Sequence, residues 1–194
     1  MRLRLSSCAL AVAPMRARPS EDAEQVTQAL LGERLEQRER QGEWVYVLTA
    51  YDYGGWIRAD ALGPLSSEPW LPARRAGDPV AEARAYLGAP YEWGGLTEAG
   101  IDCSGLVHMA FRRLGRLVPR DADQQEPHGR AVPEGDLEHG DLVTYGDAAA
   151  ADHIAFWLGG GRILHATGRG GVGRVVEEEE PPDLRGRWRL VVRF

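Results

Sequence analysis

The sequence predicts an α+β domain in its second half, preceded by a small antiparallel β domain. Residues 1–66 contain short runs rich in Tyr, Val, Ile and Trp, separated by glycines and polar turns, which is typical of antiparallel strands. Residues 63–79 carry four prolines and two glycines without any periodic pattern, and we place the linker at 67–77. In residues 78–194, two helical segments precede a series of strands, which is the order of an α+β domain.

The composition excludes several classes of protein. The chain has 194 residues, of which 43% are hydrophobic and 27% charged, as in a soluble protein with a core. A formal net charge of −6 argues against nucleic acid as a partner, because phosphate binding needs a basic surface. No block of Lys or Arg indicates an anionic membrane, and no segment approaches the length of a membrane span.

The N-terminus permits two interpretations. Leu3 and Leu5 alternate as in a first strand, whereas the early arginines and "LSSC" resemble an export or lipoprotein signal. The apolar run 8–13 is shorter than the usual signal core of about 7 to 15 residues, and Pro14 follows it directly. Two cysteines almost a hundred residues apart also suit a reducing compartment. We therefore expect a cytoplasmic protein, with an exported protein as the alternative.

In the first half, two strands are predicted at 44–49 and 55–58, on either side of a polar turn. In the second half, Asp78 is the expected N-cap of a helix that has Pro79 at its first position and ends before Gly88. Asp102 is the expected cap of the next helix, which Gly115 closes. Its apolar stripe consists of Leu106, Val107, Ala110, Phe111 and Leu114. Strands are then predicted within 140–146, 153–168, 173–180 and 189–194.

Cys103 is the first candidate for chemistry, because it directly follows the capping Asp102. A helix N-terminus presents unpaired N–H groups and the positive end of the dipole. We therefore expect the thiol pKa to fall toward neutrality there, and the same N–H groups could bind an oxyanion. The alternative is that Cys103 is a small buried hydrophobic residue.

A nucleophilic thiol needs a base, and two of the five histidines are candidates. A hairpin centred near Gly160 would set His165 opposite Ala155, with His153 as the next residue on the same face. A slip of one residue would separate the two rings, which would then be independently solvated. The other three are weaker candidates: His108 lies on the helix of Cys103, and His128 and His139 are in polar surroundings.

Five segments resemble the NlpC/P60 family of cysteine peptidases and occur in the family's order. They are "PYEWGG" (90–95), "DCSGLV" (102–107), "VPRDADQQ" (118–125), "GDLV" (140–143) and "DHIAFWLGGGRILHATG" (152–168). The first half is similar to the bacterial SH3 domain through "VAPMRARPS", "LGERLE" and "WVYV…YDYGGWI". The resemblance implies a papain-like catalytic domain, with helices packed on an antiparallel sheet, preceded by a small SH3-like β-barrel. Among such proteins, the chain most resembles γ-D-glutamyl-L-diamino acid endopeptidases.

The resemblance implies that Cys103 is the nucleophile, His153 the general base and His165 the third residue, which orients the base. The hydroxyl of Tyr91 and the backbone N–H of Cys103 would bind the oxyanion, unless Tyr91 is simply a packed aromatic ring. No metal or organic cofactor is implied.

The resemblance also implies a substrate-binding group for a murein peptide with a free N-terminal L-Ala. Asp102 and Ser104 would lie at the amine end, and Tyr53, favoured over Tyr51, would line the cleft from the SH3 domain. Asp102 can also be the N-cap, either alone or together with this role. Ala122 stands where relatives may offer a serine. Arg120 could bind a substrate carboxylate or form an ion pair with Asp121 or Asp123.

The run of glutamates at 177–180 is expected to be a solvated strand end or loop, since it lacks the spacing of a calcium site. The leading hypothesis is a cytoplasmic cysteine peptidase that cleaves the γ-D-glutamyl–diamino acid bond in cell-wall recycling. The alternatives are an exported peptidoglycan hydrolase, a non-catalytic module that binds wall peptides, and an acyl transferase of the same thiol chemistry. The polar residues beside Cys103 argue against the last of these. The sequence makes no prediction of the oligomeric state.

Overall fold

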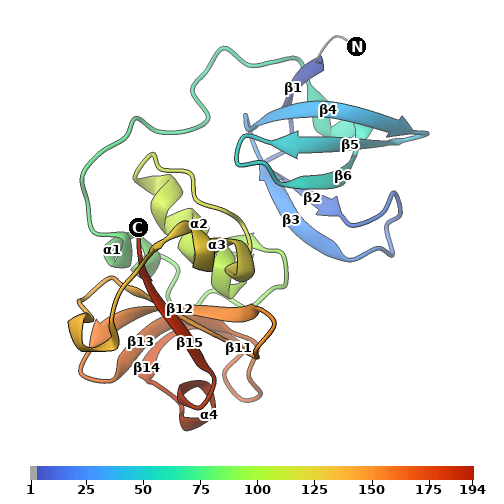
Figure 1. The fold of residues 1–194 in the computed structure, drawn as a ribbon. Coiled ribbons are helices and arrows are strands. Elements are labelled where there is room, and N and C mark those ends of the chain that lie inside the picture. The colour runs from blue at the N-terminus through green and yellow to red at the C-terminus, as the bar shows by residue number, and fades with distance from the viewer. Residues whose placement is uncertain (1–3) are drawn as a thin grey trace. The chain divides into compact units, whose positions relative to one another are not determined.

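The computed structural model describes residues 4–194, and the chain divides into two compact units, Met1–Pro72 and Ala73–Phe194 (Figure 1). The division lies inside the segment 67–77 that the sequence predicts as the linker. Within residues 4–194, no helix is both long and apolar enough to cross a membrane.

The first unit is a seven-stranded antiparallel sheet in the order β3-β2-β6-β5-β4-β1-β7. Its elements are β1 (Arg4–Cys8), β2 (Val12–Arg16), β3 (Gln25–Leu30), β4 (Arg34–Gln41), β5 (Trp44–Thr49), β6 (Gly54–Arg58), the 3-10 turn η1 (Ala59–Ala61) and β7 (Leu62–Gly63). The strands predicted at 44–49 and 55–58 are confirmed as β5 and β6. The first strand is confirmed over residues 4–8, and Leu3 lies outside the described residues. Closure of the sheet into a barrel stays a prediction.

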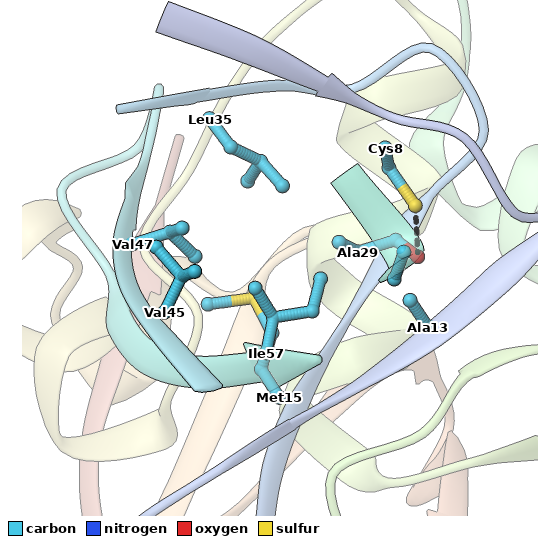
Figure 2. Close-up of a cluster of buried hydrophobic side chains, with 9 residues drawn as sticks. Cys8, Ala13, Met15, Ala29, Leu35, Val45, Val47 and Ile57 are labelled. Atoms are coloured by element: carbon cyan, nitrogen blue, oxygen red, sulfur yellow. Dashed lines mark hydrogen bonds between the residues drawn. The ribbon is translucent and has the colours of Figure 1, made fainter. Parts of the chain in front are cut away.

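The core of this unit explains Cys8. Its side chain is buried among apolar residues of β2 to β6, and its thiol donates to the Ala29 carbonyl oxygen at 3.6 Å (Figure 2). Burial raises the pKa of the Cys8 thiol. The residues packed around it are Ala13, Met15, Ala29, Leu35, Val45, Val47, Ile57 and Ala61. Cys8 is therefore a core residue of the first unit, and both cysteines are free thiols.

The second unit packs helices on one antiparallel sheet of order β10-β15-β11-β12-β13-β14. Its helices are α1 (Pro79–Arg84), α2 (Cys103–Arg113), α3 (Ala122–His128), α4 (Pro182–Arg185) and the 3-10 turn η2 (Glu134–Asp136). Its strands are β8 (Leu96–Thr97), β9 (Gly100–Ile101), β10 (Arg130–Ala131), β11 (Leu142–Gly146), β12 (Ala151–Gly159), β13 (Arg162–Thr167), β14 (Arg174–Glu179) and β15 (Trp188–Arg193). Helices α2 and α3 contact β12, and α1 and α2 contact β13 (Figure 1). The papain-like arrangement stays a prediction.

The caps predicted for two helices are confirmed. The Asp78 carboxylate accepts from the Val80 N–H at 2.9 Å and starts α1, which ends at Arg84, a turn earlier than expected. Gly88 follows that turn with a positive φ of 84°. Asp102 caps α2 by accepting from the Gly105 N–H at 2.7 Å.

Helix α3 has no counterpart among the predicted elements. It has only seven residues and contains Pro127, so no apolar period identifies it. A capping box formed by Asp121 and Gln124 starts it, and this pairing is the sequence signal that could have found it.

The hairpin of β12 and β13 has the predicted register. Phe156 pairs with Leu164 and Trp157 with Ile163, as a turn centred at Gly160 requires. The three glycines of the turn, 159–161, all have positive φ, between 60° and 91°, a conformation that L-residues rarely adopt. This register sets His153 and His165 on the same face of the sheet.

Candidate active site

Cys103 is the first residue of α2, and its thiol lies against β12. The side chain is 6% exposed, and backbone hydrogen bonds from Ile154 and Ser104 reach the sulfur. Ile154 directly follows His153 on β12. The packing of α2 on β12 therefore brings the thiol beside the part of β12 that carries His153, the predicted base.

The two predicted histidines form a direct hydrogen bond, which continues to a carboxylate. His153 Nε2 lies 2.7 Å from His165 Nδ1, and His165 Nε2 lies 2.9 Å from Glu178 Oε1. Arg169 donates to both oxygens of Glu178, at 2.8 and 2.6 Å. The His165 side chain is fully buried. The site therefore contains a relay of three hydrogen-bonded side chains behind the thiol.

Burial determines the charge state of the thiol and of the base. Burial, assisted by the negative charge of Asp102, raises the pKa of Cys103 to about 12, despite the hydrogen bonds from Ile154 and Ser104. Burial lowers the pKa of His153 to about 3, and His165 and Arg187 add to this effect. The expectation that the helix N-terminus lowers the thiol pKa is wrong, because the cost of desolvating a thiolate is larger. The resting pair is a neutral thiol and a neutral imidazole.

Tyr91 lies near this thiol. Its backbone N–H donates to the Gly173 carbonyl at 2.9 Å, and Tyr91 bridges to Ile101, just before the N-cap of α2. Burial raises the pKa of the half-buried phenol, and the neighbouring Cys103 and Asp102 contribute. The hydroxyl therefore stays protonated and can donate a hydrogen bond. Its role toward an oxyanion stays a prediction.

A buried ion pair holds the N-terminus of α2. Arg120 donates to both carboxylate oxygens of Asp102, at 2.9 and 2.8 Å, and its side chain has no exposed surface. The predicted pairing with Asp121 is only a 3.9 Å contact. Asp102 is therefore the principal partner, and the alternative that Arg120 binds a substrate carboxylate is wrong, because its guanidinium is buried and occupied.

The same ion pair organises the residues around the nucleophile. Asp102 also accepts from the Gly94 N–H at 2.7 Å, and Arg120 donates to the Gly95 carbonyl at 3.3 Å and to Ser104 Oγ at 3.0 Å. The loop that carries Tyr91, the start of α2 and the approach to α3 are thus joined at one point. Asp102 and Ser104 lie beside Cys103 as predicted, and their contact with a substrate stays a prediction.

Two glycines allow the close approach of backbone at this point. A Cβ at Gly105 would lie 2.4 Å from the Gly95 carbonyl oxygen and 2.8 Å from Asp102 Oδ1. A Cβ at Gly95 would lie 2.4 Å from the Gly100 carbonyl oxygen. Neither position has space for a side chain, so glycine is required by packing.

The remaining predicted residues lie outside this cluster. Tyr53 belongs to the first unit, in the turn between β5 and β6, and its role in substrate binding stays a prediction. Ala122 is buried at the start of α3. His108 is buried and uses Nδ1 to contact the Val118 carbonyl at 2.8 Å, whereas His128 and His139 are exposed, as expected.

The interpretation of 177–180 as a solvated strand end is confirmed only in part: β14 ends at Glu179, which is exposed, whereas Glu178 and Glu180 are partly buried. Glu177 to Glu179 belong to β14, and Glu178 binds His165. Glu180 accepts from the Tyr145 hydroxyl at 2.7 Å and from the Trp188 indole N–H. Four identical letters carry no sequence period, so only the pairing of β14 with β13 reveals which glutamate faces the histidines.

A cavity of about 240 Å³ opens beside His153. It is lined by both signs of charge, from Asp152, Asp183, Arg169 and Arg187, together with Thr167 and Leu184. Such a lining suits a ligand that carries both ammonium and carboxylate groups.

Removing Arg120 should destabilise the second unit strongly. In Arg120→Met the Asp102 carboxylate stays buried without its charged partner, so we expect the free energy of unfolding to fall by about 3–5 kcal/mol. Urea unfolding measures this loss. The double variant Asp102→Asn/Arg120→Met should recover part of it, and Arg185→Met, which breaks pairs made by a half-exposed side chain, should cost about 1 kcal/mol or less. Equal losses in Arg120→Met and Arg185→Met would contradict this account.

The buried histidines should make the second unit less stable in acid. Burial holds the pKa of both His108 and His153 at about 3 in the folded chain, against a usual value of 6.5. Between these values the unfolded chain binds more protons, so the free energy of unfolding decreases as the pH falls from about 6.5 toward about 3. Urea unfolding across this range measures the slope. It should be shallower in His153→Asn, and an unchanged slope in that variant would refute the assignment.

Two protein-family models match parts of this chain. Residues 88–182 match the NlpC/P60 family, and residues 15–62 match the bacterial dipeptidyl-peptidase Sh3 domain. A γ-D-glutamyl-L-lysine dipeptidyl-peptidase of Bacillus subtilis is 37% identical over 47% of this chain and 32% of its own length. The peptidoglycan endopeptidase RipB of Mycobacterium tuberculosis is also 37% identical, over 47% of this chain and 43% of its own length. The chain therefore matches less than half the length of these two relatives.

Solved structures give the same result for the fold. An NlpC/P60 family protein from Bacillus cereus matches with a TM-score of 0.58 and 24% identity, over 98% of this chain and 63% of that one. RipB from M. tuberculosis matches with a TM-score of 0.52 and 32% identity, over 60% of this chain and 62% of that one. The chain thus carries an NlpC/P60 domain at residues 88–182, preceded by a bacterial SH3 domain at residues 15–62.

Proposed function

We propose that this chain is a cysteine endopeptidase that hydrolyses the γ-D-glutamyl–L-diamino acid bond of murein peptides with a free N-terminal L-Ala. Its role would be in cell-wall recycling. The main support is the position of the Cys103 thiol against the backbone of Ile154. Ile154 directly follows His153, which is hydrogen-bonded to His165. The names of two relatives, a γ-D-glutamyl-L-lysine dipeptidyl-peptidase and a peptidoglycan endopeptidase, support the choice of bond.

In the proposed reaction, His153 takes the proton of the Cys103 thiol as the sulfur attacks the γ-glutamyl carbonyl carbon. The carbonyl π electrons move to the oxygen. When the tetrahedral species collapses, the C–N bond breaks and His153 returns the proton to the leaving amine. Water then hydrolyses the thioester and restores the thiol. The neutral resting pair suits this sequence, because no charge has to be buried before the substrate arrives.

The developing oxyanion would be bound by the Tyr91 hydroxyl and the Cys103 backbone N–H. Tyr91 is beside the thiol, and its pKa is raised, so its proton is available for donation. A donor already positioned for the oxyanion lowers the barrier without reorganisation during the reaction.

The leaving diamino acid would occupy the cavity beside His153. The group that receives the proton from His153 must lie next to that ring, and the cavity begins there. Its guanidinium groups, from Arg169 and Arg187, suit the carboxylate of the diamino acid, and the carboxylates of Asp152 and Asp183 suit its ammonium group.

The amine end of the peptide would lie near Asp102 and Ser104. The Asp102 carboxylate already accepts five hydrogen bonds, from Gly94, Ser104, Gly105 and twice from Arg120. An ammonium group would therefore share an oxygen with these donors, and Asp102 would contribute mainly through its charge.

The wild-type chain should hydrolyse L-Ala-γ-D-Glu-diaminopimelate and the corresponding lysine peptide, and should fail on the N-acetylated forms. Acetylation removes the ammonium charge that the amine end would recognise. Chromatography of the released diamino acid measures the rate. Cys103→Ala should have no activity, whereas Cys8→Ala, which alters the other thiol, should retain it.

Other outcomes separate the competing functions. Cleavage of both the free and the acetylated peptides would refute the requirement for a free amine and favour a hydrolase of intact wall. Cleavage of neither, with retained peptide binding, would favour a module that binds wall peptides. Equal loss in Cys8→Ala and Cys103→Ala would contradict the assignment of the nucleophile.

We further propose that the protein acts in the cytoplasm and that residues 4–8 are part of its folded form. Residues 4–8 form β1, which pairs with both β4 and β7, and Cys8 lies in the core. Cleavage after residue 8 or 13 would remove this strand. N-terminal sequencing of protein from cells and from culture medium should therefore find residues 4–8 present in a cytosolic form, and a secreted form that lacks them would end this proposal.

A further inference from the structure

A carboxylate stands behind the two active-site histidines, and the proposed triad leaves it without a role. Glu178 lies on β14, the strand paired with the strand of His165, and its Oε1 is 2.9 Å from His165 Nε2. Arg169 donates to both Glu178 oxygens. We propose that Glu178 is a positioning residue that fixes the tautomers of His165 and His153, so that His153 presents an unprotonated Nδ1 to the thiol. This inference rests on the proposed thiol chemistry.

The first step follows from the chemistry of the carboxylate. An ionised carboxylate only accepts hydrogen bonds, so the 2.9 Å contact requires a proton on His165 Nε2. Both Glu178 oxygens also accept from Arg169, as the oxygens of a carboxylate do. Burial lowers the pKa of His165, so its ring is neutral and carries no second proton. Its Nδ1 is therefore an acceptor.

In the second step, the tautomer of His165 determines the tautomer of His153. The 2.7 Å contact joins His153 Nε2 to His165 Nδ1, and since His165 Nδ1 is an acceptor, His153 Nε2 must donate. A neutral His153 then has its lone pair on Nδ1. Because Nε2 is engaged with His165, Nδ1 is the only ring atom that can take the thiol proton.

The opposite arrangement would prevent the reaction. If His165 carried its proton on Nδ1, it would donate to His153 Nε2, and the His153 proton would move to Nδ1. The ring would keep the same contacts but would have no lone pair for the thiol. The two states differ only in the positions of two protons, and the geometry selects the active one through the acceptor at Glu178.

The variant Glu178→Gln tests this proposal, because Arg169 determines how the new amide is oriented. The guanidinium has only donors and reaches both positions, at 2.6 Å from Oε2 and 2.8 Å from Oε1. The amide oxygen therefore takes the shorter contact at the Oε2 position, which leaves the NH₂ group toward His165 Nε2. His165 must then accept at Nε2 and carry its proton on Nδ1. We expect kcat to fall about 100-fold, with a much smaller change in KM, because Glu178 itself does not line the cavity proposed for the substrate.

Two readouts are independent of the substrate. ¹⁵N NMR of the histidine rings in the full chain should show His153 protonated at Nε2 in the wild type and at Nδ1 in Glu178→Gln. Alkylation of Cys103 by iodoacetamide should slow in parallel. Glu179→Gln is the matched control, since Glu179 is exposed at the next position of β14, and it should change neither readout. Glu178→Asp keeps an acceptor and should retain the wild-type tautomers.

Unchanged histidine tautomers in a folded Glu178→Gln would overturn the proposal, as would an unchanged kcat. A Glu178→Asp variant in which His153 is protonated at Nδ1 would overturn it as well. This test remains valid even if Glu178→Gln fails to fold. If the wild type cleaves no murein peptide, the proposed function fails, while the NMR and alkylation results still decide the role of Glu178.

Discussion

The buried ion pair between Asp102 and Arg120 is the interaction on which the catalytic unit depends. It fixes the first turn of α2 from one side and the loop of Tyr91 from the other, through Gly94 and Gly95. A buried pair of this kind adds little net stability compared with an apolar contact, yet either charge alone would be costly. Its contribution is therefore geometric. It fixes the position of the Cys103 thiol relative to the Tyr91 phenol, although the two residues come from separate segments of the chain.

In the proposed reaction, the thiol is activated by the histidine relay rather than by the helix. The N-terminus of α2 favours a thiolate, but burial disfavours any charge at that position, and burial has the larger effect. The proton can leave only when an acceptor lies nearby and the product charges are stabilised as they form. The site meets the first condition with a neutral His153. The dry surroundings that hold the pair neutral would also strengthen the electrostatic stabilisation of the transition state.

The sequence predicts the elements that local chemistry determines. The caps at Asp78 and Asp102, the strands β11 to β15 and the shared face of His153 and His165 all follow from short-range patterns that the structure confirms. The pairing of Asp102 with Arg120 could not be predicted in this way, because eighteen residues separate them and nearer aspartates compete. Glu178 was missed for a related reason: in a run of four glutamates, only strand register decides which one points inward.

The close approach of Gly105, at the start of α2, to Gly95 changes what the "DCSG" motif signifies. Gly105 is there because the Gly95 carbonyl leaves no room for a Cβ, and Asp102 is there because it caps a helix and neutralises a buried arginine. Ser104 accepts from the same arginine at 3.0 Å. Three of the four letters therefore have a role in assembly of the domain, whatever they add to substrate binding, and Cys103 has none. A descendant of this chain that lost its thiol would still be under pressure to retain the other three letters. A search for active enzymes should therefore weigh the cysteine together with the histidine pair and the glutamate behind it, and should treat the rest of the motif as a marker of architecture.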